Sequence, residues 1–222
     1  MTPCASRFAV QIATTDDDLR DACRVRMAGY GHHLGEVGAS FGQVDHLDVA
    51  EDVAVLICRD TDTGEPVGTV RIQTHVRYPL QVERCVILPH QITSAARAEA
   101  TRLAVLPGAD ASVKLHLMKA VYDYCEAHAI EWLVICARSQ SLARTYRMLG
   151  FQDYLAPGLM VPLTYAGNIP HLVFTMNLPQ TRQAWEQAGH RLQQFMLAPS
   201  RLVLAPAQEQ SAGLPEVAVQ VA

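Results

Sequence analysis

Residues 103–121 read LAVLPGADASVKLHLMKAV, and this stretch decides the fold. The apolar run at its start is typical of a buried strand, and Pro107-Gly108 ends that strand in a loop. Apolar residues then recur at helical spacing, which predicts a helix over 112–129 with Ser112 as its N-cap. A strand, a short loop and a helix in direct succession predict a mixed α/β fold.

The segments on either side fit the same plan. Before the opening stretch we expect a strand over 8–12, a helix from Thr15 to about Tyr30, a long loop over 31–50, a hairpin of strands over 53–59 and 67–76, and a short strand over 84–88. After it we expect a strand over 130–137, a helix over 139–150, two strands over 159–167 and 171–178, and a helix over 180–197. The chain is thus predicted to form one domain over 1–179, followed by a C-terminal helix and a loose tail over 180–222.

Composition narrows the class of protein. The chain has 222 residues, of which 50% are apolar, so it can bury a sizeable core. Its net charge of −4 gives no general attraction to nucleic acid. None of the six cysteines stands in a CxxC pair, and the N-terminal residues lack a signal-peptide pattern. We therefore expect a reduced, cytoplasmic protein without a transmembrane segment. We expect no metal, because the histidines at 32, 33 and 46 fit no ligand spacing.

Two charges stand at the head of the apolar run. In the sequence AEATRLAVLPG, residues 98–108, Glu99 and Arg102 stand just before the apolar run that starts at Leu103. Charged side chains are rarely buried without partners. Either this pair lies at the solvent-exposed end of the strand, or it is buried there because it takes part in a reaction.

Two segments resemble the GNAT acyltransferases in general, and four further short motifs resemble one branch of them. The opening stretch resembles the fourth strand, pantetheine loop and next helix of the GNAT fold, and SLARTYRMLGF (141–151) resembles the helix signature that follows. Residues 20–155 are similar to the acyl-homoserine-lactone synthases and N-acyl amino acid synthases. The matching positions are Arg26 with Tyr30, Asp45 with Asp48, Arg71, and Glu99 in EATRLAV. The resemblance implies a central, mostly antiparallel sheet flanked by helices.

Three departures bear on the substrates. Lactone synthases usually have Glu two residues before the first Asp and a Trp in the loop after the first helix, whereas this chain has Gln43 and no Trp there. The usual GNAT loop with Arg/Gln-x-x-Gly-x-Gly/Ala is absent, since Gly108 is the only glycine in PGADAS. The first two departures favour N-acylation of an intact amino acid. The third weakens the case for acyl-CoA as donor and leaves room for an acyl carrier protein.

The resemblance also implies roles for individual residues. Glu99 is the candidate base for the amine, unless it pairs with Arg102 or Arg71 as a structural residue. Tyr146 is either the acid that protonates the leaving sulfur, or a tyrosine that packs in the core or against the pantetheine. The catalytic candidates are Glu99, Tyr146 and Arg102. The candidates for the acceptor site are Arg26, Tyr30, Asp45, Asp48 and Arg71. The candidates for the oxyanion and the phosphopantetheine of the acyl donor are Val105, Leu106, Gly108, Ser112 and Val113.

The expected partners follow from this chemistry. The co-substrate is an acyl-phosphopantetheine thioester, and no permanently bound cofactor is expected. An acidic acyl carrier protein would suit a basic face, although ordinary solvated helix charges are the simpler reading. That face would be formed by Lys114, Lys119, Arg138, Arg144 and Arg147. The C-terminal helix could form a homodimer contact. Two alternatives stay open: a synthase of acyl-homoserine-lactone type, and a non-catalytic acyl-binding or regulatory domain.

Overall fold

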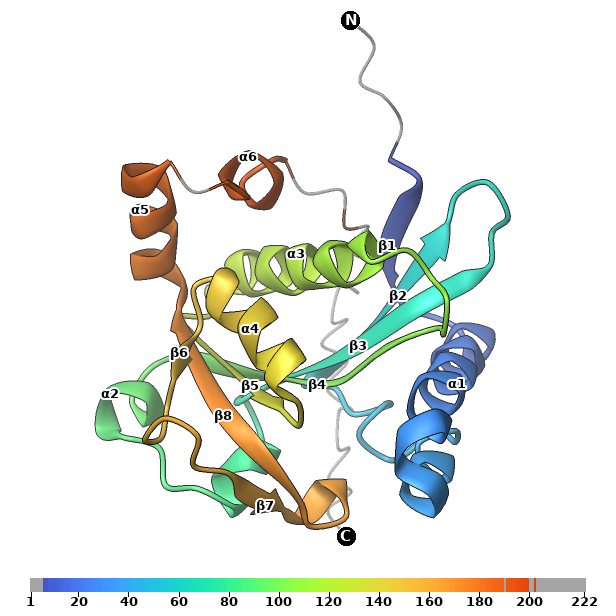
Figure 1. Ribbon diagram of the computed structural model, residues 1–222, viewed down its shortest axis with the longest axis horizontal. Coiled ribbons are helices and arrows are strands. Elements are labelled where there is room, and N and C mark those ends of the chain that lie inside the picture. The colour runs from blue at the N-terminus through green and yellow to red at the C-terminus, as the bar shows by residue number, and fades with distance from the viewer. Residues whose placement is uncertain (1–5, 190, 200–201, 203–222) are drawn as a thin grey trace, which may run out of the picture.

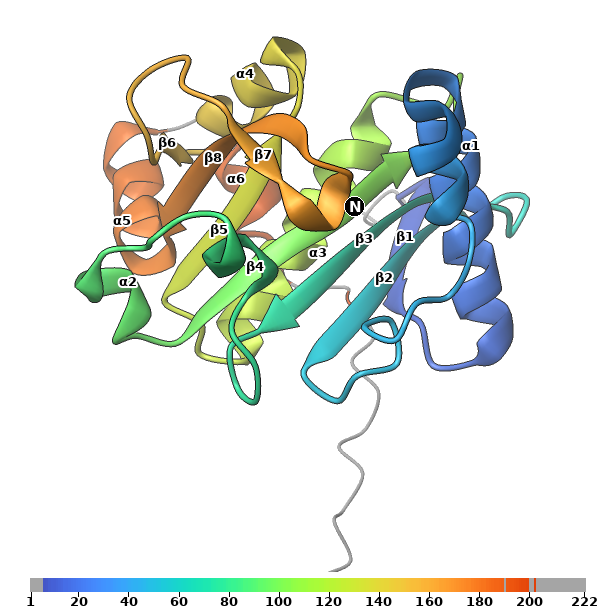
Figure 2. The ribbon, with the colours of Figure 1, turned by 90° about the horizontal axis from the view of Figure 1, so that it is seen from below.

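A mostly antiparallel sheet forms the centre of the structure, a computed structural model, and helices cover both of its faces (Figures 1 and 2). The structure describes residues 6–189, 191–199 and 202, and over 32–39 the backbone alone. The strands lie in the order β1-β2-β3-β4-β5-β8-β6, and β7 pairs with β8. Among the described strands, β4 and β5 form the one parallel pair. The mixed α/β fold with a mostly antiparallel sheet is thus confirmed.

The elements have the following bounds. The strands are β1 Phe8–Ile12, β2 Val53–Asp60, β3 Pro66–Thr74, β4 Arg97–Val105, β5 Trp132–Ala137, β6 Gln152–Asp153, β7 Val161–Leu163 and β8 Ile169–Asn177. The α-helices are α1 Asp16–Ser40, α2 His90–Thr93, α3 Ser112–Ala127, α4 Gln140–Met148, α5 Leu178–Ala188 and α6 Gln193–Met196. Two 3-10 helices are η1 Gln81–Arg84 and η2 Thr164–Ala166.

The main core lies between the sheet and α3. The apolar face predicted for this helix is buried, and it consists of Val113, Leu117, Ala120, Val121 and Tyr124. Gly68 of β3 lies directly beneath it, since a Cβ there would meet Val113 at 2.7 Å and Leu117 at 2.9 Å. A glycine at this position lets α3 approach the strand closely. The helices α4 and α5 cover the rest of this face (Figure 1).

The opposite face of the sheet has its own apolar clusters. Side chains alternate between the two faces of a strand, so Val55 and Ile57 of β2 pack against Ala22 of α1. Further along the sheet, Val134 of β5 and Val173 of β8 pack against the segment that holds η1 and α2. The sheet is therefore covered on both faces, as the apolar run of β5 indicated.

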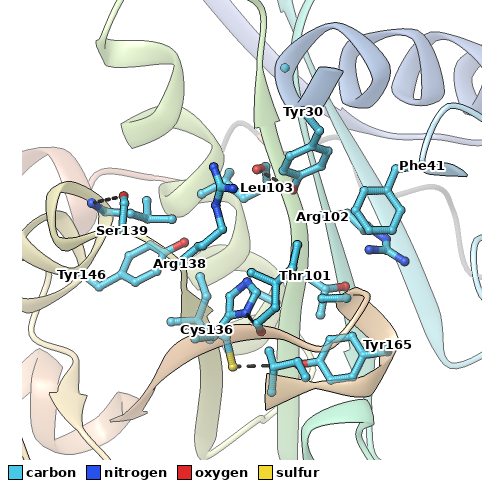
Figure 3. Close-up of a pocket in the computed structure, with 18 residues that line it drawn as sticks. Tyr30, Phe41, Thr101, Arg102, Leu103, Cys136, Arg138, Ser139, Tyr146 and Tyr165 are labelled. Atoms are coloured by element: carbon cyan, nitrogen blue, oxygen red, sulfur yellow. Dashed lines mark hydrogen bonds between the residues drawn. The ribbon is translucent and has the colours of Figure 1, made fainter. Parts of the chain in front are cut away.

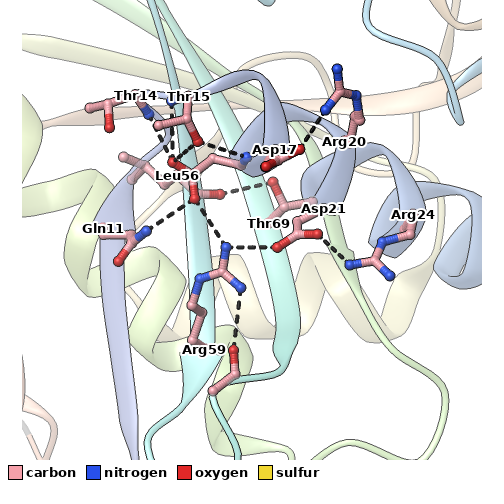
Figure 4. Close-up of polar contacts among 12 residues, drawn as sticks. Gln11, Thr14, Thr15, Asp17, Arg20, Asp21, Arg24, Leu56, Arg59 and Thr69 are labelled. Atoms are coloured by element: carbon pink, nitrogen blue, oxygen red, sulfur yellow. Dashed lines mark hydrogen bonds and ion pairs between the residues drawn. The ribbon is translucent and has the colours of Figure 1, made fainter.

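Polar contacts fix the start of α1 to the sheet (Figure 4). Thr15 accepts a hydrogen bond from the Asp18 N–H at 3.1 Å, and its hydroxyl donates to the Asp18 carboxylate at 2.9 Å. This reciprocal cap confirms Thr15 as the capping residue. Arg59 of β2 reaches across to Asp18 at 3.0 Å and to Asp21 at 2.7 Å. These hydrogen bonds hold the pKa of Asp18 below its usual range, against the opposing effect of burial.

Several element predictions were wrong. The first helix continues to Ser40 instead of ending near Tyr30, so half of the expected loop is helical. The prediction relied on the low helix propensity of the glycines in this segment, and propensity is a weak guide that does not decide the structure by itself. Residues 81–84 form η1, and no strand covers 84–88. Ser112 is the first residue of α3, and the cap position is held by Ala111. The expected last helix is divided into α5 and α6, with Gly189 at φ +56° ending the first. The predicted tail falls mostly on 200–201 and 203–222, outside the described residues.

Candidate active site

A pocket opens in the middle of the sheet, where β4 and β5 move apart. The two strands pair only from Arg97 to Ala100 on β4 and from Trp132 to Ile135 on β5. Beyond Ala100 the gap holds a pocket of about 230 Å³, walled by α1, β4, β5, α4 and the chain between β7 and β8 (Figure 3). A molecule in this pocket can meet side chains from both faces of the sheet.

A bulge in β4 shapes one wall of the pocket. The register shifts between Thr69 and Arg71 of β3, so that β4 carries an extra residue there. Arg102 lies at this bulge with φ +57°, a backbone conformation that non-glycine residues rarely adopt. The Tyr30 hydroxyl donates to the Leu103 carbonyl oxygen at 2.8 Å. This hydrogen bond ties α1 to the bulge and brings the Tyr30 ring into the pocket wall (Figure 3).

Four charged residues that the sequence singled out meet beside the pocket. Arg26 binds Asp48 with two hydrogen bonds, at 2.7 and 2.9 Å. Arg71 Nη1 contacts both carboxylate oxygens of Asp45, at 2.8 and 2.9 Å, and one of Asp48 at 3.3 Å. Arg26, Arg71 and Asp48 are buried, and buried charges of this kind persist only when they are paired. The network holds α1, β3 and the loop after α1 together.

Arg102 adds a positive charge that this network does not balance. Its guanidinium lies 3.6 Å from the centre of the Phe41 ring, and its nearest ion pair is with Asp45 at 3.9 Å. Burial and the nearby charge of Arg71 lower the pKa of Arg102 to about 10, so it stays protonated at neutral pH. Arg102 is one of the residues that line the pocket, with its guanidinium against the Phe41 ring (Figure 3). This end of the pocket is therefore suited to an anion.

Glu99 lies beneath the pocket and is fully buried. Its Oε1 accepts a hydrogen bond from the Tyr165 hydroxyl at 2.6 Å, and its Oε2 accepts one from the Val82 N–H at 3.0 Å. Among the described residues, no ion pair joins Glu99 to Arg102 or Arg71. Burial raises the pKa of Glu99 to about 7, while the two hydrogen bonds and the charge of Arg71 oppose that rise. A carboxyl group in this state can exchange a proton near neutral pH.

Tyr146 of α4 is a second aromatic residue in the wall. It is 1% exposed, and it packs at the edge of Phe174 with ring centres 5.8 Å apart. Burial raises the pKa of its hydroxyl well above the usual range. Tyr146 therefore belongs both to the core and to the pocket wall.

The residues predicted to hold the acyl donor lie at the end of β4 and the start of α3, outside the pocket wall described above. The Leu106 N–H already donates to the Val67 carbonyl at 3.0 Å, and Val113 is fully buried. The Ser112 N–H donates to the Asp110 carboxylate at 2.8 Å. The five predicted positions, Val105, Leu106, Gly108, Ser112 and Val113, are close in sequence but differ in exposure. Their role stays a prediction.

Ion pairs engage part of the predicted basic face. Lys119 pairs with Asp123 at 2.6 Å, and Arg147 pairs with Asp153 at 2.7 Å. Arg138 and Arg144 lie exposed at the pocket's α4 side. The positive surface is therefore smaller than the sequence indicated.

Tyr165 is a site residue that the sequence analysis missed, as is Phe41 beside Arg102. Tyr165 lies in η2, within a segment whose apolar residues suggested a plain strand. Figure 3 shows it in the pocket wall, and its hydroxyl contacts the Cys136 sulfur at 3.8 Å. Gly167, with φ +69°, ends η2 in the left-handed conformation. The pair Gly167-Asn168 was the one local signal of a turn at this point.

Comparison with solved structures identifies the fold. FeeM, an N-acyl amino acid synthase from uncultured soil microbes, matches with a TM-score of 0.62 and 18% identity over 85% of this chain and 98% of its own. BjaI, a CoA-dependent acyl-homoserine lactone synthase, matches with a TM-score of 0.59 and 20% identity over 88% of this chain and 92% of its own. A protein from Desulfovibrio desulfuricans assigned to the GNAT acetyltransferases matches with a TM-score of 0.55 and 12% identity over 77% and 99%.

The chain therefore has the GNAT acyltransferase fold. The predicted resemblance to N-acyl amino acid synthases and acyl-homoserine-lactone synthases is confirmed at the level of structure, since both kinds are among these neighbours. No protein-family model matches the sequence, and a search of curated proteins finds no match.

The described residues contain no cluster of three or more histidine, cysteine or acidic side chains placed to hold a metal ion. None of their helices is both long and apolar enough to cross a membrane.

Proposed function

We propose that this protein is an N-acyltransferase that moves a fatty acyl chain from a thioester to the α-amine of an amino acid. Glu99 carries the proposal. It is a fully buried carboxyl group with a pKa of about 7, one hydrogen bond away from a pocket in a GNAT sheet. Amide formation requires an uncharged amine, and a base whose pKa is near the working pH accepts its proton efficiently.

Arg102 supports an amino acid as the acceptor. A free amino acid brings a carboxylate along with its amine, and the guanidinium in the pocket wall can bind that carboxylate by two hydrogen bonds. Tyr30 and Phe41 stand next to it with their rings 5.4 Å apart, edge to face. These apolar surfaces would contact the side chain of the acceptor.

The proposed donor is an acyl-phosphopantetheine thioester, carried by an acyl carrier protein or by CoA. The thioester supplies the activated carbonyl, so that no permanently bound cofactor is needed. Tyr146 lies in the wall where it could protonate the leaving sulfur. The five described cysteines at 23, 58, 85, 125 and 136 are unpaired, which supports work in the reducing cytoplasm. A homodimer through the C-terminal helix and an acyl carrier protein as partner belong to the same proposal.

The test uses purified protein with long-chain acyl thioesters and a mixture of amino acids. Released thiol is measured against time, and the product is identified by mass. We expect an N-acyl amino acid from the wild type and at least a 100-fold lower rate from Glu99→Gln. The control is Glu126→Gln on α3, which lies outside the pocket.

Each other outcome counts against part of the proposal. A lactone product would favour the acyl-homoserine-lactone synthase. Tight acyl binding without thiol release would favour a non-catalytic acyl-binding domain. Equal rates from wild type and Glu99→Gln would leave the reaction in place and make Glu99 a structural residue.

A further inference from the structure

Glu99 is separated from the pocket by another side chain. It is fully buried and does not form part of the pocket wall, whereas Tyr165 does. Both carboxylate oxygens of Glu99 are already engaged, Oε1 by the Tyr165 hydroxyl at 2.6 Å and Oε2 by the Val82 N–H. An amine in the pocket therefore meets the Tyr165 oxygen before it can meet the carboxylate.

We propose that the Tyr165 hydroxyl relays the proton of the acceptor amine to Glu99. This inference rests on the proposed function. A phenol oxygen can accept one hydrogen bond while its own O–H donates another, and the geometry already provides the second of these. Tyr165 would thus be the group that touches the substrate, and Glu99 the final acceptor of the proton.

Proton transfer accompanies formation of the amide bond. The uncharged amine attacks the thioester carbonyl, and its N–H proton moves to the Tyr165 oxygen as the N–C bond forms. The O–H proton of Tyr165 moves at the same time to Glu99 Oε1. The C–S bond then breaks, and its electron pair leaves with the sulfur as a thiolate. Glu99 later releases its proton to solvent, which restores the starting state.

The charges around the pair fit a relay. Burial and the adjacent carboxylate raise the pKa of Tyr165 far above its usual range, so the phenol passes a proton on without remaining ionised. Arg71 of β3 stabilises the ionised form of Glu99. On β5, Cys136 faces the same point, and burial raises the pKa of its thiol well above the usual range, so that it stays neutral. Cys85, in the loop after η1, is the remaining titratable neighbour of Cys136.

The chain offers a matched control for the test. Tyr122 of α3 is buried, whereas Tyr165 is half-buried, and the Tyr122 hydroxyl likewise donates to a carboxylate, that of Glu126, at 3.1 Å. This pair lies outside the pocket wall. Tyr122→Phe and Tyr165→Phe therefore remove the same kind of hydrogen bond, and only the second removes it from the pocket.

The experiment compares wild type, Tyr165→Phe, Glu99→Gln, the double variant and Tyr122→Phe. We expect Tyr165→Phe to lower kcat about 100-fold at nearly unchanged KM for the amino acid. We expect the double variant to be no slower than Glu99→Gln, since the two residues act in one path. Carboxyl ¹³C NMR, assigned by its loss in Glu99→Gln, should show a higher pKa of Glu99 in Tyr165→Phe. Tyr122→Phe should match wild type in all three measurements.

Failure of the relay can be distinguished from failure of the proposed function. Amide formed equally fast by wild type and Tyr165→Phe, or rate losses that multiply in the double variant, would overturn the relay and leave the proposed function intact. No amide from the wild type with any thioester would overturn the proposed function and the relay together. An unchanged pKa of Glu99 in Tyr165→Phe would show that the two groups are not coupled, and this readout needs no activity.

Discussion

Arg26 of α1 and Asp48 of the following loop form a two-pronged ion pair in which 1% of either side chain is exposed. The distances are 2.7 Å for Nη1–Oδ2 and 2.9 Å for Nη2–Oδ1. Asp48 also lies 3.3 Å from Arg71, so one carboxylate serves two buried guanidinium groups. Removing a carboxylate from such a site leaves buried positive charge without compensation.

Asp48→Asn should therefore destabilise the protein by about 3–5 kcal/mol. The measurement is urea unfolding at pH 7, and the control is Asp62→Asn at an exposed position. In a double-mutant cycle, Arg26→Met should cost less in the Asp48→Asn background than in the wild type. A change of under 1 kcal/mol for Asp48→Asn would contradict this account of the network.

Arg102→Met should weaken binding of the amino acid rather than of the acyl donor. The lost contact is the two-pronged one with the substrate carboxylate, so KM for the amino acid should rise by at least about 10- to 100-fold, since even one charge-assisted hydrogen bond contributes that much. An amine of the same shape without a carboxylate should react equally with wild type and variant. Arg144→Met on the exposed face of α4 is the control. Equal losses for both amines would assign Arg102 to the fold or the chemistry instead.

Glu99 should make stability depend on pH. Its folded-state pKa of about 7 lies above the usual 4.5 of a glutamate, so the folded chain holds a proton that the unfolded chain loses first. The stabilisation that comes from protonated Glu99 is therefore fully present below about pH 4.5 and is lost as the pH rises to 7. Relative to Glu99→Gln, the wild type should lose about 3 kcal/mol across this window and nothing further above it. Thermal unfolding of both proteins from pH 4 to 9 measures the difference; parallel curves would refute the raised pKa.

Gly68→Ala should destabilise the protein by about 1–3 kcal/mol, because the added methyl group would press on Val113 and Leu117 in the core. The matched control is Gly31→Ala in α1, where a Cβ would meet no atom within 4 Å. That change should instead stabilise the helix by up to about 1 kcal/mol. Chemical unfolding of both variants gives the comparison. A stabilising Gly68→Ala would mean that α3 can shift away from β3.

Local sequence patterns predicted the elements whose periodicity is strong. The apolar spacing of 113–124 identified the buried face of α3, and the alternation at 8–12 identified β1. The position of Glu99 beside an apolar run was enough to mark it as unusual, and the resemblance brought Arg26, Asp48 and Arg71 into one site. The contacts among these residues are long-range, and no local pattern contains them.

The parts that sequence reasoning missed depend on tertiary packing. The extension of α1 to Ser40 runs through several glycines, which local propensity assigns to a loop. Tyr165 shows the same limit at the site. Its importance arises from a carboxylate 66 residues earlier in the chain, and a tyrosine in an apolar segment gives no sign of such a partner.

The hydrogen bond from Tyr30 to Leu103 joins positions 73 residues apart. Such contacts form only after much chain entropy has been lost, and so they depend on assembly of the whole sheet rather than on any single segment. A fragment of the chain would therefore not form the pocket. A molecule that binds there binds only the fully folded protein, so its binding energy stabilises the entire fold against unfolding.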